Sequence, residues 1–151
     1  MNNKHVRYLN LAKHFSTWSK DPSTQVGAVA IGTKGQVLAQ GYNGFPRKVE
    51  ESDERLGDRE LKYKFTVHAE MNCIYNAGWN GTSLDGSSLY VYGLPVCHDC
   101  AKGIIQSGIK AVYVPNHDGV SEKWFKSTLI TMKMFEEAGV YYELINSVHF
   151  E

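Results

Sequence analysis

The sequence has few cysteines and no excess of charge of either sign. Three of its 151 residues are cysteine, and this odd, low number argues against a fold held together by disulfides. Lys and Arg together number 16, as do Asp and Glu, so the formal net charge is zero. A neutral chain exerts no overall electrostatic attraction on a polynucleotide or an anionic membrane. We therefore expect neither nucleic acid nor membrane among its partners.

Long hydrophobic runs are also missing. No stretch approaches the roughly 18 apolar residues that a membrane helix needs. The first 15 residues mix charged and apolar side chains, without the continuous apolar core of a signal peptide. A hydrophobic fraction of 42% is nevertheless sufficient for a packed core. These features predict one cytoplasmic domain over residues 1–151, in which reduced Cys97 and Cys100 serve a metal or redox function.

The apolar pattern predicts helices and strands in alternation. Helical spacing covers residues 6–18, 68–79, 97–108 and 122–139, and short β-prone runs cover residues 25–31, 36–42, 87–92, 110–115 and 140–145. The first two strands form a hairpin that turns at Gly35. In the last helix, the apolar stripe consists of Phe125, Leu129, Met132 and Phe135. The order α-β-β-α-β-α-β-α-β predicts an α/β fold, with a five-stranded, mostly parallel sheet and helices on both faces.

Residues 47–64 form a run of charge between the hairpin and the second predicted helix. The run holds six acidic and six basic residues. This balance favours a solvated helix that is stabilised by ion pairs. The alternative is a flap that closes over a polar ligand.

The centre of the sequence holds four residues whose types and spacing indicate chemistry: His68 and Glu70, then Cys97 and Cys100. One histidine and two cysteines make three zinc ligands, which leaves a fourth position open for water, as in catalytic sites. Glu70 then lies beside the bound water as a proton shuttle. The alternatives are a redox pair, which has no use for the histidine and the carboxylate, and a structural zinc site. The candidates for a fourth ligand in a structural site are His98, His117 and Cys73.

Four blocks of sequence resemble deoxycytidylate deaminases, within the zinc-dependent cytidine deaminase superfamily. They are S-K-D-P-S-T-Q-V-G at 19–27, G-Y-N-G-F-P at 41–46, H-A-E-M-N at 68–72 and C-H-D-C-A-K at 97–102. The wider pattern H-x-E…P-C-x-x-C is typical of zinc nucleobase deaminases in general. The resemblance implies a three-layer cytidine-deaminase-like fold and hydrolysis of dCMP to dUMP and ammonia, which feeds dTTP synthesis. Some small relatives also accept dCTP.

The resemblance also implies roles for individual residues. A zinc-activated water attacks C4 of the base, and Glu70 delivers protons to N3 and to the departing amine. The backbone N–H of Ala69 faces the base O2, and Asn43 holds the 3′-hydroxyl of the sugar. The other implied substrate contacts are Val26, Trp124 as an aromatic lid, and Lys20 or Lys123 for the 5′-phosphate. The alternatives are a turn-forming Asn43, a core Trp124, solvated lysines and, for Cys73, a small buried hydrophobe.

Two features differ from what relatives show. Val96 separates Pro95 from Cys97, whereas the family has proline directly before the first cysteine. This insertion puts the detailed geometry of the ligand loop in question. Residues 47–66 contain neither Cys nor His, so the second, structural zinc of some relatives is not expected. We expect one Zn²⁺ per chain.

Regulation is a further implication of the resemblance. Members with G-Y-N-G are activated by dCTP and inhibited by dTTP, as Mg²⁺ complexes, in a homohexamer. This assigns a regulatory site to Gly41, Tyr42 and Gly44, where two glycines would let a loop adopt two arrangements. The alternative is a simple turn in an unregulated enzyme.

The sequence features allow two alternative functions, a tRNA adenosine deaminase and a non-catalytic zinc-binding scaffold. A tRNA adenosine deaminase shares the zinc pattern but needs a basic surface, and the zero net charge argues against it. A non-catalytic zinc-binding scaffold has no use for the Glu70 carboxylate.

Overall fold

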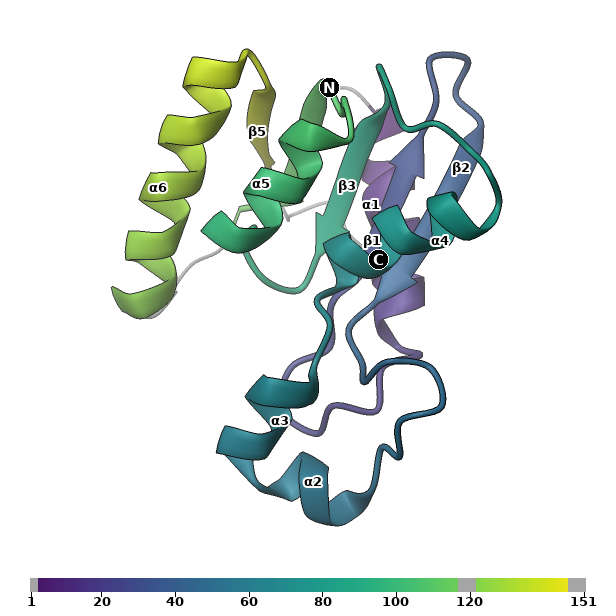
Figure 1. Cartoon of the computed structure of the whole chain (residues 1–151). Coiled ribbons are helices and arrows are strands. Elements are labelled where there is room, and N and C mark those ends of the chain that lie inside the picture. Colours follow the sequence, from purple (N-terminus) through teal and green to yellow (C-terminus); the bar gives the residue numbers. More distant parts are fainter. Residues whose placement is uncertain (1–2, 117–121, 147–151) are drawn as a thin grey trace.

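The computed structural model describes residues 3–116 and 122–146 (Figure 1). His117, one of the candidate ligands, lies outside these residues. No helix in the described ranges is both long and apolar enough to span a bilayer. The helices and strands follow in the order α1 (Asn3–Ser16), β1 (Gly27–Ile31), β2 (Val37–Tyr42), α2 (Asp53–Gly57), α3 (Arg59–Phe65), α4 (Ala69–Trp79), β3 (Ser88–Tyr92), α5 (His98–Gln106), β4 (Ala111–Pro115), α6 (Glu122–Ala138) and β5 (Tyr141–Ile145).

The five predicted strands form one sheet in the order β2-β1-β3-β4-β5. The α/β class and the five strands are confirmed, but the sheet is mixed rather than mostly parallel. β1 pairs antiparallel with both β2 and β3, while β3, β4 and β5 run parallel. The difference has a simple cause. A tight hairpin forces its two strands to be antiparallel, and only the strand–helix–strand units that contain α5 and α6 produce parallel pairs.

Helices cover both faces of the sheet, as predicted. Helix α1 lies on one face, and α4, α5 and α6 lie on the other (Figure 1). Alternate residues of β1 face the two layers. Val29 and Ile31 pack with Leu9 of α1, whereas Ala28 and Ala30 belong to the larger core on the other side. All five residues of β1 are therefore buried, which is why this strand lacks an alternating polar pattern.

The predicted apolar stripe of α6 is wrong for three of its four members. Phe125, Leu129 and Met132 are exposed, and only Phe135 belongs to the core. The other fully buried side chain of this helix is the polar Thr131. The helix is turned so that hydroxyl groups, rather than the stripe, face the loop before α5. Spacing alone cannot reveal this orientation, because it identifies an apolar face but not the surface against which that face packs.

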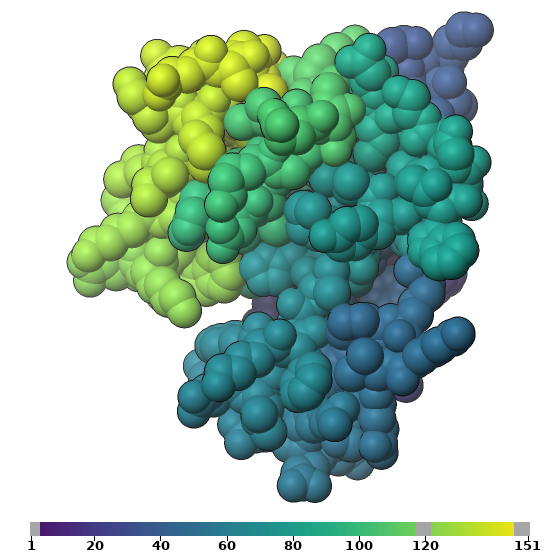
Figure 2. Space-filling model, in the orientation of Figure 1, coloured from purple at the N-terminus to yellow at the C-terminus, as the bar shows by residue number. Residues whose placement is uncertain are grey.

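Residues 47–66, called here the α2–α3 lobe, project from the main body (Figures 1 and 2). The expected single helix is two short helices, because Asp58 ends α2 and caps α3. Its Oδ1 accepts hydrogen bonds from the backbone N–H groups of Glu60 and Leu61 at 3.1 and 3.2 Å. Only one ion pair lies within this fully described segment, between Lys64 and Glu60. The favoured interpretation, a helix held by many ion pairs, therefore does not describe the lobe.

Candidate active site

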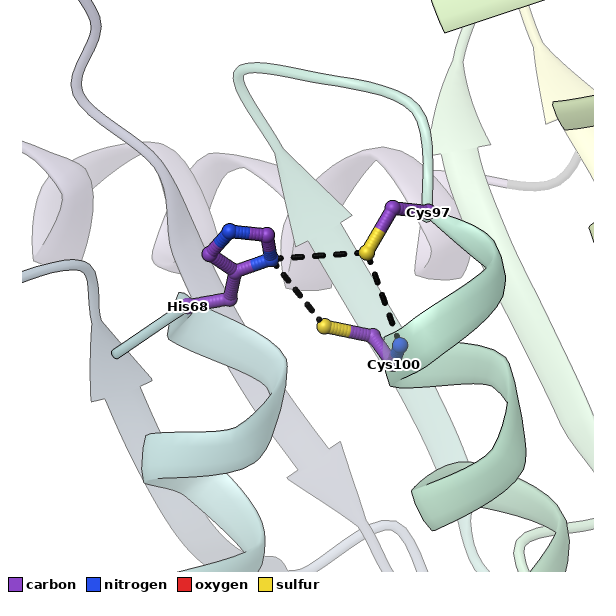
Figure 3. Close-up of side chains that lie close together, drawn as sticks. All are labelled: His68, Cys97 and Cys100. Atoms are coloured by element: carbon purple, nitrogen blue, oxygen red, sulfur yellow. Dashed lines mark hydrogen bonds between the residues drawn. The ribbon is translucent and has the colours of Figure 1, made fainter. Parts of the chain in front are cut away.

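Three potential metal ligands converge where two helices begin. His68 is the N-cap residue of α4, and Cys97 is the N-cap residue of α5. The His68 Nδ1 atom lies 3.4 Å from the Cys97 Sγ and 3.3 Å from the Cys100 Sγ (Figure 3). The C-x-x-C spacing brings the two sulfurs together because an N-cap side chain approaches the N–H group three residues ahead. Here the Cys97 Sγ accepts a hydrogen bond from the Cys100 N–H at 3.5 Å.

The donor set fits a catalytic zinc ion. One candidate atom from each of the three residues lies within 4.8 Å of the others. Ligands bound tetrahedrally at zinc distances of about 2.0–2.3 Å lie roughly 3.5 Å apart, close to the separations seen here. In residues 3–116 and 122–146 this is the one group of three such side chains. Neither His98 nor Cys73 joins it, so the described residues offer three ligands and not the four of a closed structural site.

The three ligands perturb one another's pKa values. Hydrogen bonds from Cys100 and His68 lower the pKa of Cys97 to about 4. The hydrogen bond with Cys97 raises the pKa of His68 to about 9. The Cys100 pKa is raised well above its usual range by its hydrogen bond to Cys97 and by burial. The lowered pKa favours the thiolate form of Cys97, which is the form that binds metal ions.

Glu70 is the buried carboxyl group of the site. It is the second residue of α4, is 4% exposed and lines the same pocket as the three ligands. Burial raises its pKa to about 7. A carboxyl group with a pKa near neutrality can both accept and donate a proton at physiological pH, which is the requirement for a proton shuttle.

Helix α6 holds the backbone on both sides of Cys97. The Thr131 hydroxyl donates to the Val96 carbonyl oxygen at 2.9 Å, and the Ser127 hydroxyl accepts from the His98 N–H at 3.0 Å. The two hydroxyls lie one helical turn apart and therefore share a face of α6. Val96 is fully buried. The residue inserted before Cys97 is thus accommodated in the core, and the three ligands still converge.

A pocket of about 670 Å³ opens in front of the three ligands. It lies where the α2–α3 lobe meets the main body, and Figure 2 shows the surface hollowed there. Of the substrate residues expected from sequence, the pocket is lined by Val26, Asn43, Ala69 and Trp124. Lys20 is exposed and does not line it, whereas Lys123 does.

Asn43 braces one wall of this pocket. It is 6% exposed, its Oδ1 accepts from the Val26 N–H at 2.8 Å, and its Nδ2 donates to the Thr24 carbonyl at 2.9 Å. The Ser19 hydroxyl in turn donates to the Asn43 carbonyl oxygen at 2.8 Å. An asparagine amide has two N–H groups and two lone pairs on its oxygen. One of each remains for a ligand in the pocket.

The residues assigned to regulation do not line the pocket. Gly41 lies within β2, opposite Ala28, and Gly44 pairs with Val67 through two backbone hydrogen bonds. Neither glycine has a positive φ. The conformational freedom that the sequence suggested is therefore not used at these two positions. A Cβ at Gly41 would lie 2.4 Å from the Cys73 backbone nitrogen, so close packing requires glycine there.

Sequence reasoning missed the pocket residues of the α2–α3 lobe. Arg59, Lys62 and Tyr63 line the pocket, together with Asp21 of the main body. Lys62 is buried, and its Nζ lies 3.0 Å from the Asp21 Oδ1. The position of the lobe supports the alternative interpretation of the charge run, a flap over a polar ligand. The available signal was the lack of any apolar stripe in a segment placed directly before His68.

Comparison with known proteins agrees with this geometry. Residues 2–115 match the family described as "Cytidine and deoxycytidylate deaminase zinc-binding region". An uncharacterized deaminase encoded in the luxG 3′ region of Aliivibrio fischeri is 39% identical over 135 residues, which cover 89% of this chain and 88% of the relative. The deoxycytidylate deaminase of Homo sapiens is 39% identical over 131 residues, which cover 81% of this chain and 68% of the relative.

The fold also matches a solved structure of a dCMP deaminase. The enzyme of cyanophage S-TIM5, determined in complex with dCMP and dUMP, superposes with a TM-score of 0.76. The match covers 96% of this chain and 98% of the phage enzyme, at 27% sequence identity. Nearly the whole chain therefore has a counterpart in the fold of that enzyme.

Proposed function

The chain belongs to the cytidine and deoxycytidylate deaminase family of zinc-dependent hydrolases, and from this premise we propose that it converts dCMP and water to dUMP and ammonia. The observation on which the proposal depends is the position of Glu70. Its buried carboxyl group shares a pocket with His68, Cys97 and Cys100 and has a pKa raised to about 7. A scaffold protein has no need for a proton-transferring group at this place.

The residues of the site divide the reaction between them. His68, Cys97 and Cys100 would hold the zinc ion, which would supply a Lewis acid that lowers the pKa of water. Glu70 accepts the proton that the attacking water loses and delivers it to N3 of the cytosine ring. It then takes the second proton, from the hydroxyl group now on C4, and passes it to the amino group as the bond between C4 and the amino nitrogen breaks, which leaves a C4 carbonyl and ammonia. The pocket excludes bulk water from these transfers, because Glu70 is almost completely buried.

The walls of the pocket offer groups for the base and the sugar. The His68 side chain does not cap α4, so the first N–H groups of this helix, including that of Ala69, stay available for the base O2. Trp124 and Val26 provide apolar surface for the ring. Asn43 has one N–H and one lone pair left for the 3′-hydroxyl. These assignments combine the family resemblance with the positions of the side chains in the pocket.

Arg59 and Lys123 replace Lys20 as our candidates for binding the 5′-phosphate. Arg59 and Tyr63 lie one turn apart on α3, and the Lys123 Nζ from α6 lies 5.3 Å from the centre of the Tyr63 ring. Arg59, Tyr63 and Lys123 all line the pocket. Within the described ranges, the guanidinium group of Arg59 makes no hydrogen bond or ion pair with another residue. A guanidinium group with free donors is well suited to a phosphate.

Substrate comparison tests the proposal. Ammonia release is followed with dCMP, deoxycytidine, dCTP and an RNA anticodon stem, for the wild type and for Glu70→Gln. We expect the highest kcat/KM for dCMP and a large loss of turnover in the variant, with equal zinc content in both proteins. Preference for the RNA stem would favour a tRNA adenosine deaminase. Zinc binding without release of ammonia from any substrate would favour the non-catalytic scaffold.

We further propose a homohexamer in the cytoplasm, regulated by dCTP and dTTP as Mg²⁺ complexes. Its support is the resemblance at residues 41–46 and the apolar side of α6, whose exposed Phe125, Leu129 and Met132 favour a protein interface. Sedimentation measures the assembly, and initial rates against dCMP at rising dTTP measure the regulation. Inhibition that is purely competitive, without a change in cooperativity, would contradict regulation at a second site.

A further inference from the structure

The α2–α3 lobe contributes one buried charge to the main body. The Lys62 side chain is 7% exposed, and that of its partner Asp21 is 10% exposed. Every other ion pair within residues 3–116 and 122–146 joins side chains that are at least 45% exposed. A surface pair contributes little to stability, but removal of one member of a buried pair leaves an uncompensated charge. The Lys62–Asp21 pair is therefore a buried ion pair that joins the lobe to the body.

The same carboxylate oxygen also shapes the pocket wall. The Asp21 Oδ1 accepts hydrogen bonds from the backbone N–H groups of Ser23 at 2.8 Å and Thr24 at 3.0 Å. The Thr24 carbonyl then accepts from the Asn43 amide, as described above. A continuous series of polar contacts thus runs from Lys62 through Asp21 and Thr24 to Asn43. Both ends of this series lie in the pocket.

We propose that Lys62 and Asp21 are positioning residues, whose ion pair holds the 21–26 segment and Asn43 in the arrangement that receives the substrate sugar. This inference rests on the proposed function for its substrate. The lysine acts through the carboxylate and the backbone that the carboxylate orders. Its ammonium group is already neutralised by Asp21, in contrast to Arg59 at the pocket mouth. The α2–α3 lobe and the 21–26 segment consequently become ordered together.

A double-mutant cycle tests the proposal in the zinc-loaded protein. The variants are Lys62→Met, Asp21→Asn and the double variant, with Lys62→Arg as the conservative change. Lys64→Met is the matched control, because Lys64 lies on the same helix and is 68% exposed in its pair with Glu60. We expect each single variant to raise KM for dCMP about tenfold or more, with a smaller change in kcat and unchanged zinc content. The double variant should be no worse than the worse single variant, and Lys62→Arg should recover most of the loss.

Other outcomes would overturn the proposal. If Lys62 binds the phosphate directly, the two single effects multiply in the double variant. Lys62→Met then lowers kcat/KM for dCMP but leaves that for deoxycytidine unchanged. If the single variants lose thermal stability but keep the KM of the Lys64→Met control, the Lys62–Asp21 pair stabilises the fold without positioning the substrate site.

Hydrogen exchange separates this inference from the proposed function. In Lys62→Met the amides of Ser23, Thr24 and Val26 should exchange faster than in wild type and in Lys64→Met, whatever the substrate is. Unchanged exchange at these amides would disprove the positioning role. If wild type does not deaminate dCMP but exchange responds as expected, the proposed function fails while the link between the lobe and the wall stands.

Discussion

The group formed by His68, Cys97 and Cys100 and the α2–α3 lobe line the same pocket but are built in different ways. Cys97 and Cys100 are buried in the main core, and hydroxyl groups of α6 fix the loop that carries Cys97. The lobe contains a single buried residue in its two helices, Lys62, and that residue is charged. The comparison indicates that the two cysteines are held by the core, whereas the lobe is joined to the body by a few polar contacts.

Of the changes considered, removal of a proposed zinc ligand should reduce activity and stability most. Cys97→Ala deletes a thiolate that both binds the metal and caps α5, so we expect loss of zinc, loss of all measurable turnover and a lower melting temperature. Zinc content by metal analysis and thermal unfolding measure these effects. Full zinc content in the variant would remove Cys97 from the ligand set.

The next largest effect should come from Glu70→Gln. This change keeps the size of the side chain but removes the group that transfers protons. We expect turnover to fall by about 10²–10⁴-fold with zinc and fold retained. Ammonia release under saturating dCMP measures the turnover, and metal analysis measures the zinc content. A variant within tenfold of wild type would show that another group transfers the proton.

Thr131→Val tests whether the support from α6 matters for metal binding. The change removes the hydrogen bond to the Val96 carbonyl but keeps the shape of the side chain. Loss of such supporting contacts typically lowers metal affinity by about 10–100-fold. Competition with a chromogenic chelator measures the affinity. Thr128→Val is the control, because its hydroxyl donates to Trp124 in the same helix. Equal zinc affinity in the two variants would contradict the supporting role.

The smallest effect should appear in the pH dependence of the lobe contact. Hydrogen bonds from Thr24, Ser23 and Lys62 outweigh burial and hold the pKa of Asp21 below its usual range. Because the folded pKa is lowered, the stabilisation is complete above the unfolded pKa of about 3.9 and is lost as pH falls through the folded value. Urea unfolding should show wild type more stable than Asp21→Asn by on the order of 1 kcal/mol at pH 6. The difference should shrink below pH 4, and a constant difference would assign it to another cause.

The sequence predicted the elements of the core better than their relative orientation. All five strands and the helices from α4 to α6 lie near the predicted residues, because apolar spacing is a local property. The pairing of β1 with β3 and the rotation of α6 depend on contacts between distant segments. Thr131 shows the limit well. From sequence, a polar residue in a helix with an apolar face is expected at the surface. Thr131 is buried instead, because its hydroxyl donates to the Val96 carbonyl oxygen.

The grouping of His68, Cys97 and Cys100 could be predicted from sequence, but much of the pocket could not. His68, Glu70, Cys97 and Cys100 follow short spacings with a direct chemical meaning. Lys62 and Asp21 are 41 positions apart, and each is an ordinary surface residue by type. The choice between Lys20 and Lys123 for the phosphate, and the absence of Arg59 from the candidates, have the same reason: sequence cannot show which of many cations faces a cavity. The regulatory assignment of Gly41, Tyr42 and Gly44 stays a prediction.

The geometry of the pocket is sensitive to any side chain at position 41, although Gly41 does not line the pocket. Its missing side chain lets α4 approach β2 so closely that a Cβ would lie 2.6 Å from the Ala69 carbonyl oxygen as well as against Cys73. Both neighbours are backbone atoms of α4, so even the methyl group of alanine would displace the start of α4 away from β2. Since that helix start carries His68 and Glu70, its displacement would separate them from the two cysteines of α5. In a saturation mutagenesis screen scored on deamination, position 41 should therefore be as intolerant as Glu70, although glycine there contacts neither metal nor nucleotide.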